Sequence, residues 1–186
     1  MAIKIYIDQG HNYSNPNAGA EGNGFREQDI TYDIGTRLAA LLRADPEFEV
    51  RTSRTSPTQI LGNTVSQSLA ARVQDANSWG ADYFISLHTN ASTVMSASGT
   101  EAFVYNLSSP ATGLAEEIVE GITEATGLRN RGVASRPGLY VLKRTAMPAA
   151  LIEMGFISNA NDAALMTQNP ELFARGIYKG IKDYFD

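Results

Sequence analysis

This chain of 186 residues contains only two histidines, and each stands at the end of a predicted strand. His11 follows the apolar run 2–8, and His88 closes a second run of the same kind. A third apolar run ends on a single charged residue, Glu153. Imidazole and carboxylate groups bind metal ions and transfer protons. These three side chains are therefore the ones from which we expect metal-assisted or acid–base chemistry.

Other chemistries are excluded by what the composition and the motifs lack. No cysteine occurs, which removes disulfides, cysteine-rich zinc sites, iron–sulfur clusters and thiol nucleophiles. The chain has 20 Asp and Glu against 15 Lys and Arg, a net charge of −5, so it lacks the basic face that binding of nucleic acid requires. There is no glycine-rich phosphate loop after a strand, no G-x-S-x-G motif and no H-E-x-x-H motif. The site must therefore be assembled from separate strand ends.

The elements that position these side chains alternate along the chain. Apolar runs predict strands at 2–8, 48–52, 82–88, 99–105, 139–142 and 149–153, and helical spacing predicts helices at 27–44, 65–79, 114–125 and 161–186, the last as one or two helices. This alternation predicts an α/β fold, a single domain over residues 1–186 with a mostly parallel sheet and helices on both faces. Because ligands bind beyond the carboxyl ends of the strands in such sheets, His11, His88 and Glu153 should meet at one edge.

A hydrolytic zinc centre needs three protein ligands and an open position for water, and two histidines with one carboxylate satisfy this requirement. Three acidic residues are candidates for the carboxylate: Glu27 and Asp29 at the start of the first helix, and Glu21 in the loop before it. The residues alone leave this choice open. Glu153 would then be a second carboxylate, outside the ligand set, that takes a proton from water and returns it.

Structural roles compete with these functional ones. An acidic residue in the first turn of a helix, such as Glu27, is favoured by the helix dipole without any metal. Glu153 could be the ion-pair partner of Arg54 or Arg144. A histidine at a strand end is most often a hydrogen-bonded loop residue.

Four motifs nevertheless occur together in one order. They are DQGH at 8–11, REQDI at 26–30, SLHTNA at 86–91 and PAALIEMGFISN at 148–159. With them the chain resembles, over residues 5–185, the zinc-dependent N-acetylmuramoyl-L-alanine amidases of the Amidase_3 family. The resemblance implies a six-stranded twisted sheet, a Zn²⁺ ion held by His11, Glu27 and His88, and Glu153 as general base and acid. It thus favours Glu27 over Glu21 and Asp29.

The resemblance also implies an activity and a substrate. The expected reaction is hydrolysis of the amide between the lactyl group of N-acetylmuramic acid and the L-alanine of the stem peptide in peptidoglycan. Asn90, Ser86 and Arg54 are expected to contact the substrate or to support the ligands. One departure is Asn12-Tyr13, where the family usually has two glycines. The larger side chains are expected to affect substrate access or loop geometry. Residues 105–131 have room for one ordinary helix, so we expect an open cleft without an autoinhibitory insertion.

Three other functions fit part of these observations. They are a zinc peptidase that cuts within the stem peptide, a wall-binding module with a silent site, and a metal-free α/β domain that binds sugars or nucleotides. Family membership implies an extracellular or cell-wall location, although no signal peptide or membrane span is found in the sequence. We therefore expect a trimmed catalytic domain or a phage-type release, and a monomer. Because both this chain and the cell wall are acidic, the chain has little electrostatic attraction to the wall, and a separate wall-targeting module outside this chain is expected.

Overall fold

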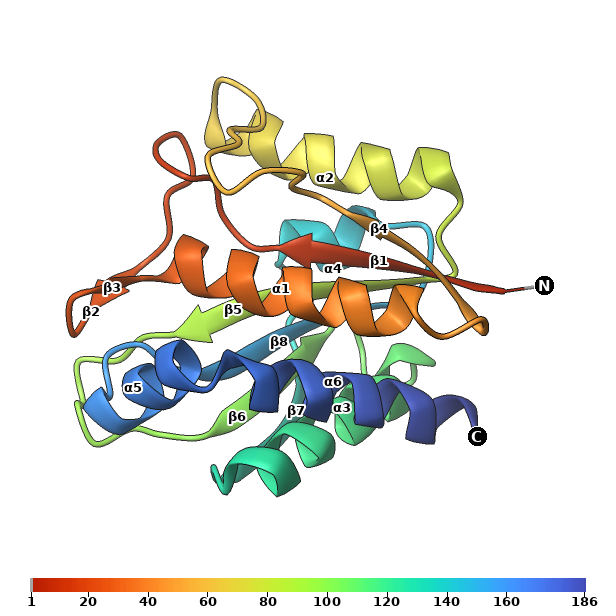
Figure 1. The fold of residues 1–186 in the computed structure, drawn as a ribbon. Helices are drawn as coiled ribbons and strands as arrows, with labels where there is room; N and C mark the ends of the chain where they lie inside the picture. The colour runs from red at the N-terminus through yellow and green to blue at the C-terminus, as the bar shows by residue number, and fades with distance from the viewer. Residues whose placement is uncertain (1) are drawn as a thin grey trace.

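The computed structural model describes residues 2–186, which form a six-stranded sheet with helices on both faces (Figure 1). The strands of the sheet, in the order β4-β1-β5-β8-β6-β7, are β4 (Phe48–Thr52), β1 (Ile3–Gln9), β5 (Tyr83–Asn90), β8 (Ala149–Phe156), β6 (Thr100–Val104) and β7 (Asn130–Ser135). A separate hairpin pairs β2 (Glu21–Gly22) with β3 (Phe25–Arg26). The helices are α1 (Glu27–Arg43), α2 (Val65–Trp79), α3 (Ala111–Thr126), α4 (Tyr140–Arg144), α5 (Ala160–Gln168) and α6 (Pro170–Phe185).

Strand direction brings three carboxyl ends to one edge of the sheet. β4, β1, β5 and β8 run parallel, whereas β6 runs antiparallel to β8 and is followed by β7, which is parallel to β6. The ends of β1 and β5 point toward the side where the β2–β3 hairpin and α5 lie, and both chain termini lie on the opposite side (Figure 1). The predicted fold class, with its mostly parallel sheet between helices, is confirmed.

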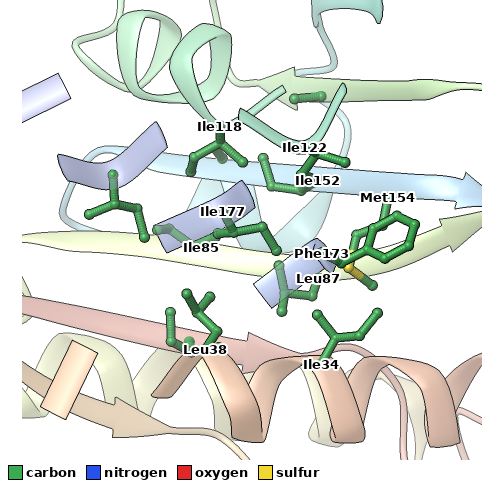
Figure 2. Packing of buried hydrophobic residues seen from close by; sticks show 14 of the residues in the cluster. Ile34, Leu38, Ile85, Leu87, Ile118, Ile122, Ile152, Met154, Phe173 and Ile177 are labelled. Atoms are coloured by element: carbon green, nitrogen blue, oxygen red, sulfur yellow. The ribbon is translucent and has the colours of Figure 1, made fainter. Parts of the chain in front are cut away.

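One face of the sheet is packed against α1, α3 and α6. Because side chains alternate along a strand, Ile85 and Leu87 of β5 both point to this face, and Ile34 and Leu38 of α1 meet them one helical turn apart (Figure 2). The apolar stripe of α6, which includes Phe173 and Ile177, fills the space between α1 and α3. Among the residues labelled in Figure 2, those from the sheet and from all three helices are buried.

The opposite face of the sheet carries a second apolar cluster and, beyond it, polar side chains. Tyr6, Phe84 and Leu151 pack there against α2 and α4, in a second apolar cluster. Farther along β5 and β8, toward their carboxyl ends, His88 and Glu153 lie on this face and are register partners. Because side chains alternate along a strand, His88 and Glu153 lie on the face that α2 and α4 leave partly open.

One predicted strand was wrong, and one strand of the sheet was missed. Residues 139–142, predicted as a strand, begin the helix α4, because Val141 and Leu142 are adjacent in sequence and both pack into the second cluster. The edge strand is instead β7, which was missed. β7 is polar, with only two of its six residues half-buried, so it lacks the apolar alternation that predicts a strand.

The helices begin and end largely where their sequence signals lie. Thr64 caps α2 by accepting from the backbone N–H of Gln67, and Gly80 ends it in a left-handed conformation with φ of 68°. Residues 161–186 form two helices, since Pro170 starts α6. Between β6 and β7 lies the single helix α3, as expected. Within residues 2–186, the helices are too short or too polar to cross a membrane.

Candidate metal centre

His11, Glu27 and His88 come together at the carboxyl edge of the sheet. His11 follows β1, Glu27 is the first residue of α1, and His88 lies in β5. The Nε2 atom of His11 is 3.1 Å from Oε2 of Glu27, and the Nδ1 atom of His88 is 3.1 Å from Oε1 of the same carboxylate. One ligand atom from each residue lies within 4.8 Å of the others. The three groups thus surround a space that one metal ion can occupy.

The carboxylate of Glu27 is held on both oxygens. The backbone N–H of Thr89 donates to Oε1 at 2.9 Å, and that of Ala20 donates to Oε2 at 2.9 Å. Burial alone would raise the pKa of Glu27, but the hydrogen bonds from His11 and His88 outweigh burial and lower the pKa. The residue is therefore a fixed anion, buried between two imidazoles.

His11 is held in a conformation that non-glycine residues rarely adopt. Its φ is 69°, in the left-handed region, which costs of order 1–3 kcal/mol. The guanidinium of Arg72 stabilises this turn by donating from Nη2 to the His11 carbonyl at 2.6 Å. The strain is thus maintained by a buried side chain from α2, 61 residues away in the sequence.

Two glycines make room for the ligands. A Cβ atom at Gly10 would lie 2.6 Å from Cε1 of the His88 ring, and one at Gly19 would lie 2.9 Å from Oε2 of Glu27. The backbone on both sides of the site therefore approaches the ligands more closely than any larger residue permits. These positions were not among the predicted site residues, because a glycine in a polar loop has no sequence signal beyond that of a turn.

A buried ion pair supports the loop that carries His11. Arg72 donates to Oδ1 of Asp8 at 2.6 Å, and the exposed fractions of the two side chains are 1% and 2%. The hydroxyl of Ser86 donates to Oδ2 of the same carboxylate at 2.7 Å. Burial would raise the pKa of Asp8, but the charge of Arg72 and the Ser86 hydrogen bond outweigh burial and lower the pKa.

Replacing Asp8 by asparagine should lower the free energy of unfolding by about 3–5 kcal/mol, because the change leaves the Arg72 charge buried without a counter-charge. Denaturant unfolding measures this loss. The control is Asp33→Asn, which removes the partner of Arg37 in a pair whose exposed fractions are 50% and 43%. That change should cost less than about 1 kcal/mol. Equal effects of the two substitutions would contradict the supporting role of Asp8.

Glu153 lies beside the three ligand candidates without joining them. It is the register partner of His88, and its Oε2 atom is buried with no hydrogen-bond partner among residues 2–186. Burial raises the pKa of Glu153 to about 7, against the opposing charge of His88. Neither Arg54 nor Arg144 forms an ion pair with it, so the purely structural alternative for this residue is wrong. A carboxyl group in this state suits proton transfer near neutral pH.

The three predicted accessory residues have different surroundings. Ser86 is fully buried and bound to Asp8, and Arg54 is 1% exposed, donating to the backbone carbonyls of Gln28 and Pro57. Neither has surface left for a substrate, so of their two predicted roles, contact with the substrate or support of the ligands, their burial favours support. Asn90 is half-buried at the end of β5 and donates to the carboxylate of Glu101.

The two residues after the first histidine fix its loop. The side-chain oxygen of Asn12 accepts from the backbone N–H of Leu61 at 3.1 Å and from Arg72 at 3.2 Å, and Asn12 is fully buried. The Tyr13 ring lies on the outside, with its centroid 4.8 Å from Cζ of Arg26. The bulk in place of two glycines therefore affects loop geometry, by connecting this loop to α2 and to the segment before it.

The other two carboxylate candidates lie outside the site. Asp29 forms an exposed ion pair with Arg26 at 2.8 Å, and Glu21 is exposed in β2. Another buried acidic residue, Asp162, accepts from Ser98, Gly99 and Phe156 and so fixes the loop before β6. A cavity of about 130 Å³ adjoins both histidines, with Leu69, Leu139 and Leu151 among its apolar lining.

The donor set fits zinc. Two imidazoles and one carboxylate, converging from separate elements, are one of the three-ligand sets of hydrolytic zinc sites. Nδ1 of His11 is buried without a partner, as is Oε2 of Glu153, so the site contains polar atoms that the residues 2–186 do not satisfy among themselves. The fold and the site together define an α/β protein with a candidate hydrolytic metal centre at the carboxyl edge of its sheet.

Sequence comparison identifies the family. The Amidase_3 family, described as N-acetylmuramoyl-L-alanine amidase, matches residues 5–183. The chain belongs to this family and is an N-acetylmuramoyl-L-alanine amidase that acts on peptidoglycan. The predicted family, activity and class of enzyme are confirmed.

Individual relatives agree with the family over nearly the whole chain. The N-acetylmuramoyl-L-alanine amidase CwlM of Bacillus licheniformis is 36% identical, over 99% of this chain and 69% of its own length. The sporulation-specific N-acetylmuramoyl-L-alanine amidase of Bacillus subtilis is 34% identical with the same coverage of both chains. The crystal structure of N-acetylmuramoyl-L-alanine amidase from Clostridium difficile 630 superposes with a TM-score of 0.88, at 29% identity, over 100% of this chain and 97% of that one.

Proposed function

We propose that His11, Glu27 and His88 hold a Zn²⁺ ion and that Glu153 is the general base and acid of the amidase. The observation that carries this proposal is the position of Glu153, next to His88 across the sheet but outside the group of three ligand candidates. A hydrolytic centre requires this division between groups that bind the metal and one that moves protons.

The residues of the chain have separate roles in the hydrolysis. When bound, zinc polarises the scissile carbonyl and lowers the pKa of water, and it offsets the negative charge that develops on oxygen. Glu153 accepts a proton from the attacking water and then delivers it to the nitrogen of the leaving L-alanine. The backbone N–H groups of Thr89 and Ala20 keep Glu27 oriented, and Arg72 keeps His11 in its left-handed turn. The geometry is therefore set before the substrate arrives.

We infer further that residues 1–186 act as one catalytic domain and as a monomer at the cell wall. All four proposed site residues come from this one chain, and none requires a second copy to complete the site. This supports a domain that is competent by itself.

The test is mass spectrometry of peptidoglycan digested with and without a chelator. The expected products are glycan with a free lactyl carboxylate and stem peptides with a free L-alanine amine, because only the lactyl–alanine amide is cut. Chelation should abolish both products, and added Zn²⁺ should restore them. Fragments cut between residues of the stem would instead establish the peptidase, and undiminished digestion after chelation would contradict the metal centre.

A further inference from the structure

The partly open face of the sheet continues from the candidate metal centre toward the edge strand β7. Glu101 of β6 is the register partner of Glu153, and Phe103, two residues along, is the partner of Leu151. All four side chains therefore lie on the same face as His88. This row of side chains, from Glu153 across β6, borders the site on the side away from His11.

At the end of this row stands an arginine whose charge is unpaired. Arg136 directly follows β7, is exposed, and holds its Cζ atom 4.4 Å from the centroid of the Phe103 ring. Within residues 2–186 its guanidinium forms no ion pair and no hydrogen bond, whereas Arg131 on the same edge lies 3.8 Å from Glu101 and donates to the Ser98 carbonyl. Stacking on a ring fixes the plane of a guanidinium and leaves its N–H donors available.

The position of Arg136 relative to Glu153 suits a group on the substrate. Phe103 is one strand across and two residues along from Glu153, a separation of roughly 8 Å from strand spacing and rise. In an extended peptide two residues span about 7 Å. A stem peptide that has its alanine nitrogen at Glu153 and runs along this row would bring its second residue to the height of Phe103 and Arg136.

We propose that Arg136 binds a carboxylate of the stem peptide and so makes the enzyme prefer stems with a free carboxyl at the second residue over amidated ones. This inference rests on the proposed function, because it places the leaving amine beside Glu153. A guanidinium recognises a carboxylate through two parallel hydrogen bonds, and an amide in its place can accept only part of them.

The experiment compares hydrolysis of three muropeptides of equal length by the wild-type enzyme and by Arg136→Gln. The first carries a free α-carboxyl at its second residue, the second carries the amide there, and the third has its C-terminal carboxyl amidated instead. Arg136→Gln should lower kcat/KM for the first at least about tenfold, mainly through KM, and for the second less than about twofold. Arg136→Lys should retain part of the preference, since it keeps the charge but not the planar fork.

The matched control is Arg129→Gln, which removes an exposed arginine just before β7. It should leave all three rates unchanged. A loss on the first two substrates that disappears on the third would place the recognised carboxylate at the end of the stem and would overturn the assignment to the second residue. Equal losses on all three substrates, or no loss on any, would overturn the inference. If the wild-type enzyme releases no free lactyl sugar from any of them, the proposed function itself fails.

Discussion

Replacing Glu153 by glutamine should lower the turnover of peptidoglycan by roughly 10²- to 10⁴-fold, the contribution typical of general acid–base catalysis. Glutamine keeps the shape of the side chain but can neither accept a proton from water nor deliver one to the leaving nitrogen. Since Glu153 lies outside the group formed by His11, Glu27 and His88, the variant should still bind zinc in a one-to-one ratio. Muropeptide release and metal content, measured on the same preparation, check both parts.

The fold should tolerate this change. Oε2 of Glu153 has no hydrogen-bond partner among residues 2–186, so the neutral amide removes no interaction that the folded chain makes through that atom. Glu116→Gln, the same substitution at an exposed position of α3, serves as the control and should retain full activity. Wild-type turnover in Glu153→Gln would show that another group moves the proton. Loss of zinc together with turnover would instead make Glu153 a ligand.

Replacing Glu27 by alanine should remove the metal and the activity together. Partners that merely orient a zinc ligand contribute about 10–100-fold to affinity, so loss of a ligand should weaken zinc binding by at least about 100-fold. Metal analysis after dialysis against a weak chelator measures this change directly. The substitution also leaves the backbone N–H groups of Thr89 and Ala20 without their acceptor, so stability should fall as well.

Two comparisons separate metal loss from misfolding. Glu27→Gln keeps an oxygen for one of these N–H groups but removes the charge, so it should fold better than Glu27→Ala and still bind zinc poorly. Glu21→Ala and Asp29→Ala change the other two acidic candidates, both exposed, and should retain zinc and activity. A full equivalent of zinc in Glu27→Ala would transfer the ligand role to one of them.

The sequence predicted the part of this fold that depends on local pattern. Helices at 27–44 and 65–79 agree closely with α1 and α2, because an apolar stripe at helical spacing must face the core wherever the helix lies. The exceptions are β7 and α4. β7 is half-buried at best, and α4 is only five residues long, so neither has enough buried surface to impose a pattern.

For the site, the same distinction holds. The sequence alone predicted that His11, His88 and Glu153 meet at one edge of a parallel sheet, since strand direction follows from the alternation of elements. The structure places His88 and Glu153 inside β5 and β8, which continue to Asn90 and Phe156. The pattern of residues left three acidic candidates open, and the family resemblance favoured Glu27. The tertiary structure distinguishes the three physically, by burying Glu27 and exposing Glu21 and Asp29.

The tertiary structure also decided which residues support the site and which remain free to bind. Arg72 and Arg54 are buried and donate to backbone carbonyls, and Arg72 also to Asp8, whereas Arg136 is exposed and stacks on the Phe103 ring. Arg54, Arg72 and Arg136 have the same conformational propensities and the same charge, and their sequence neighbours do not distinguish their roles. Their roles depend on contacts between segments as far as 64 residues apart, as between Asp8 and Arg72, which strand order and register create only when the chain has folded.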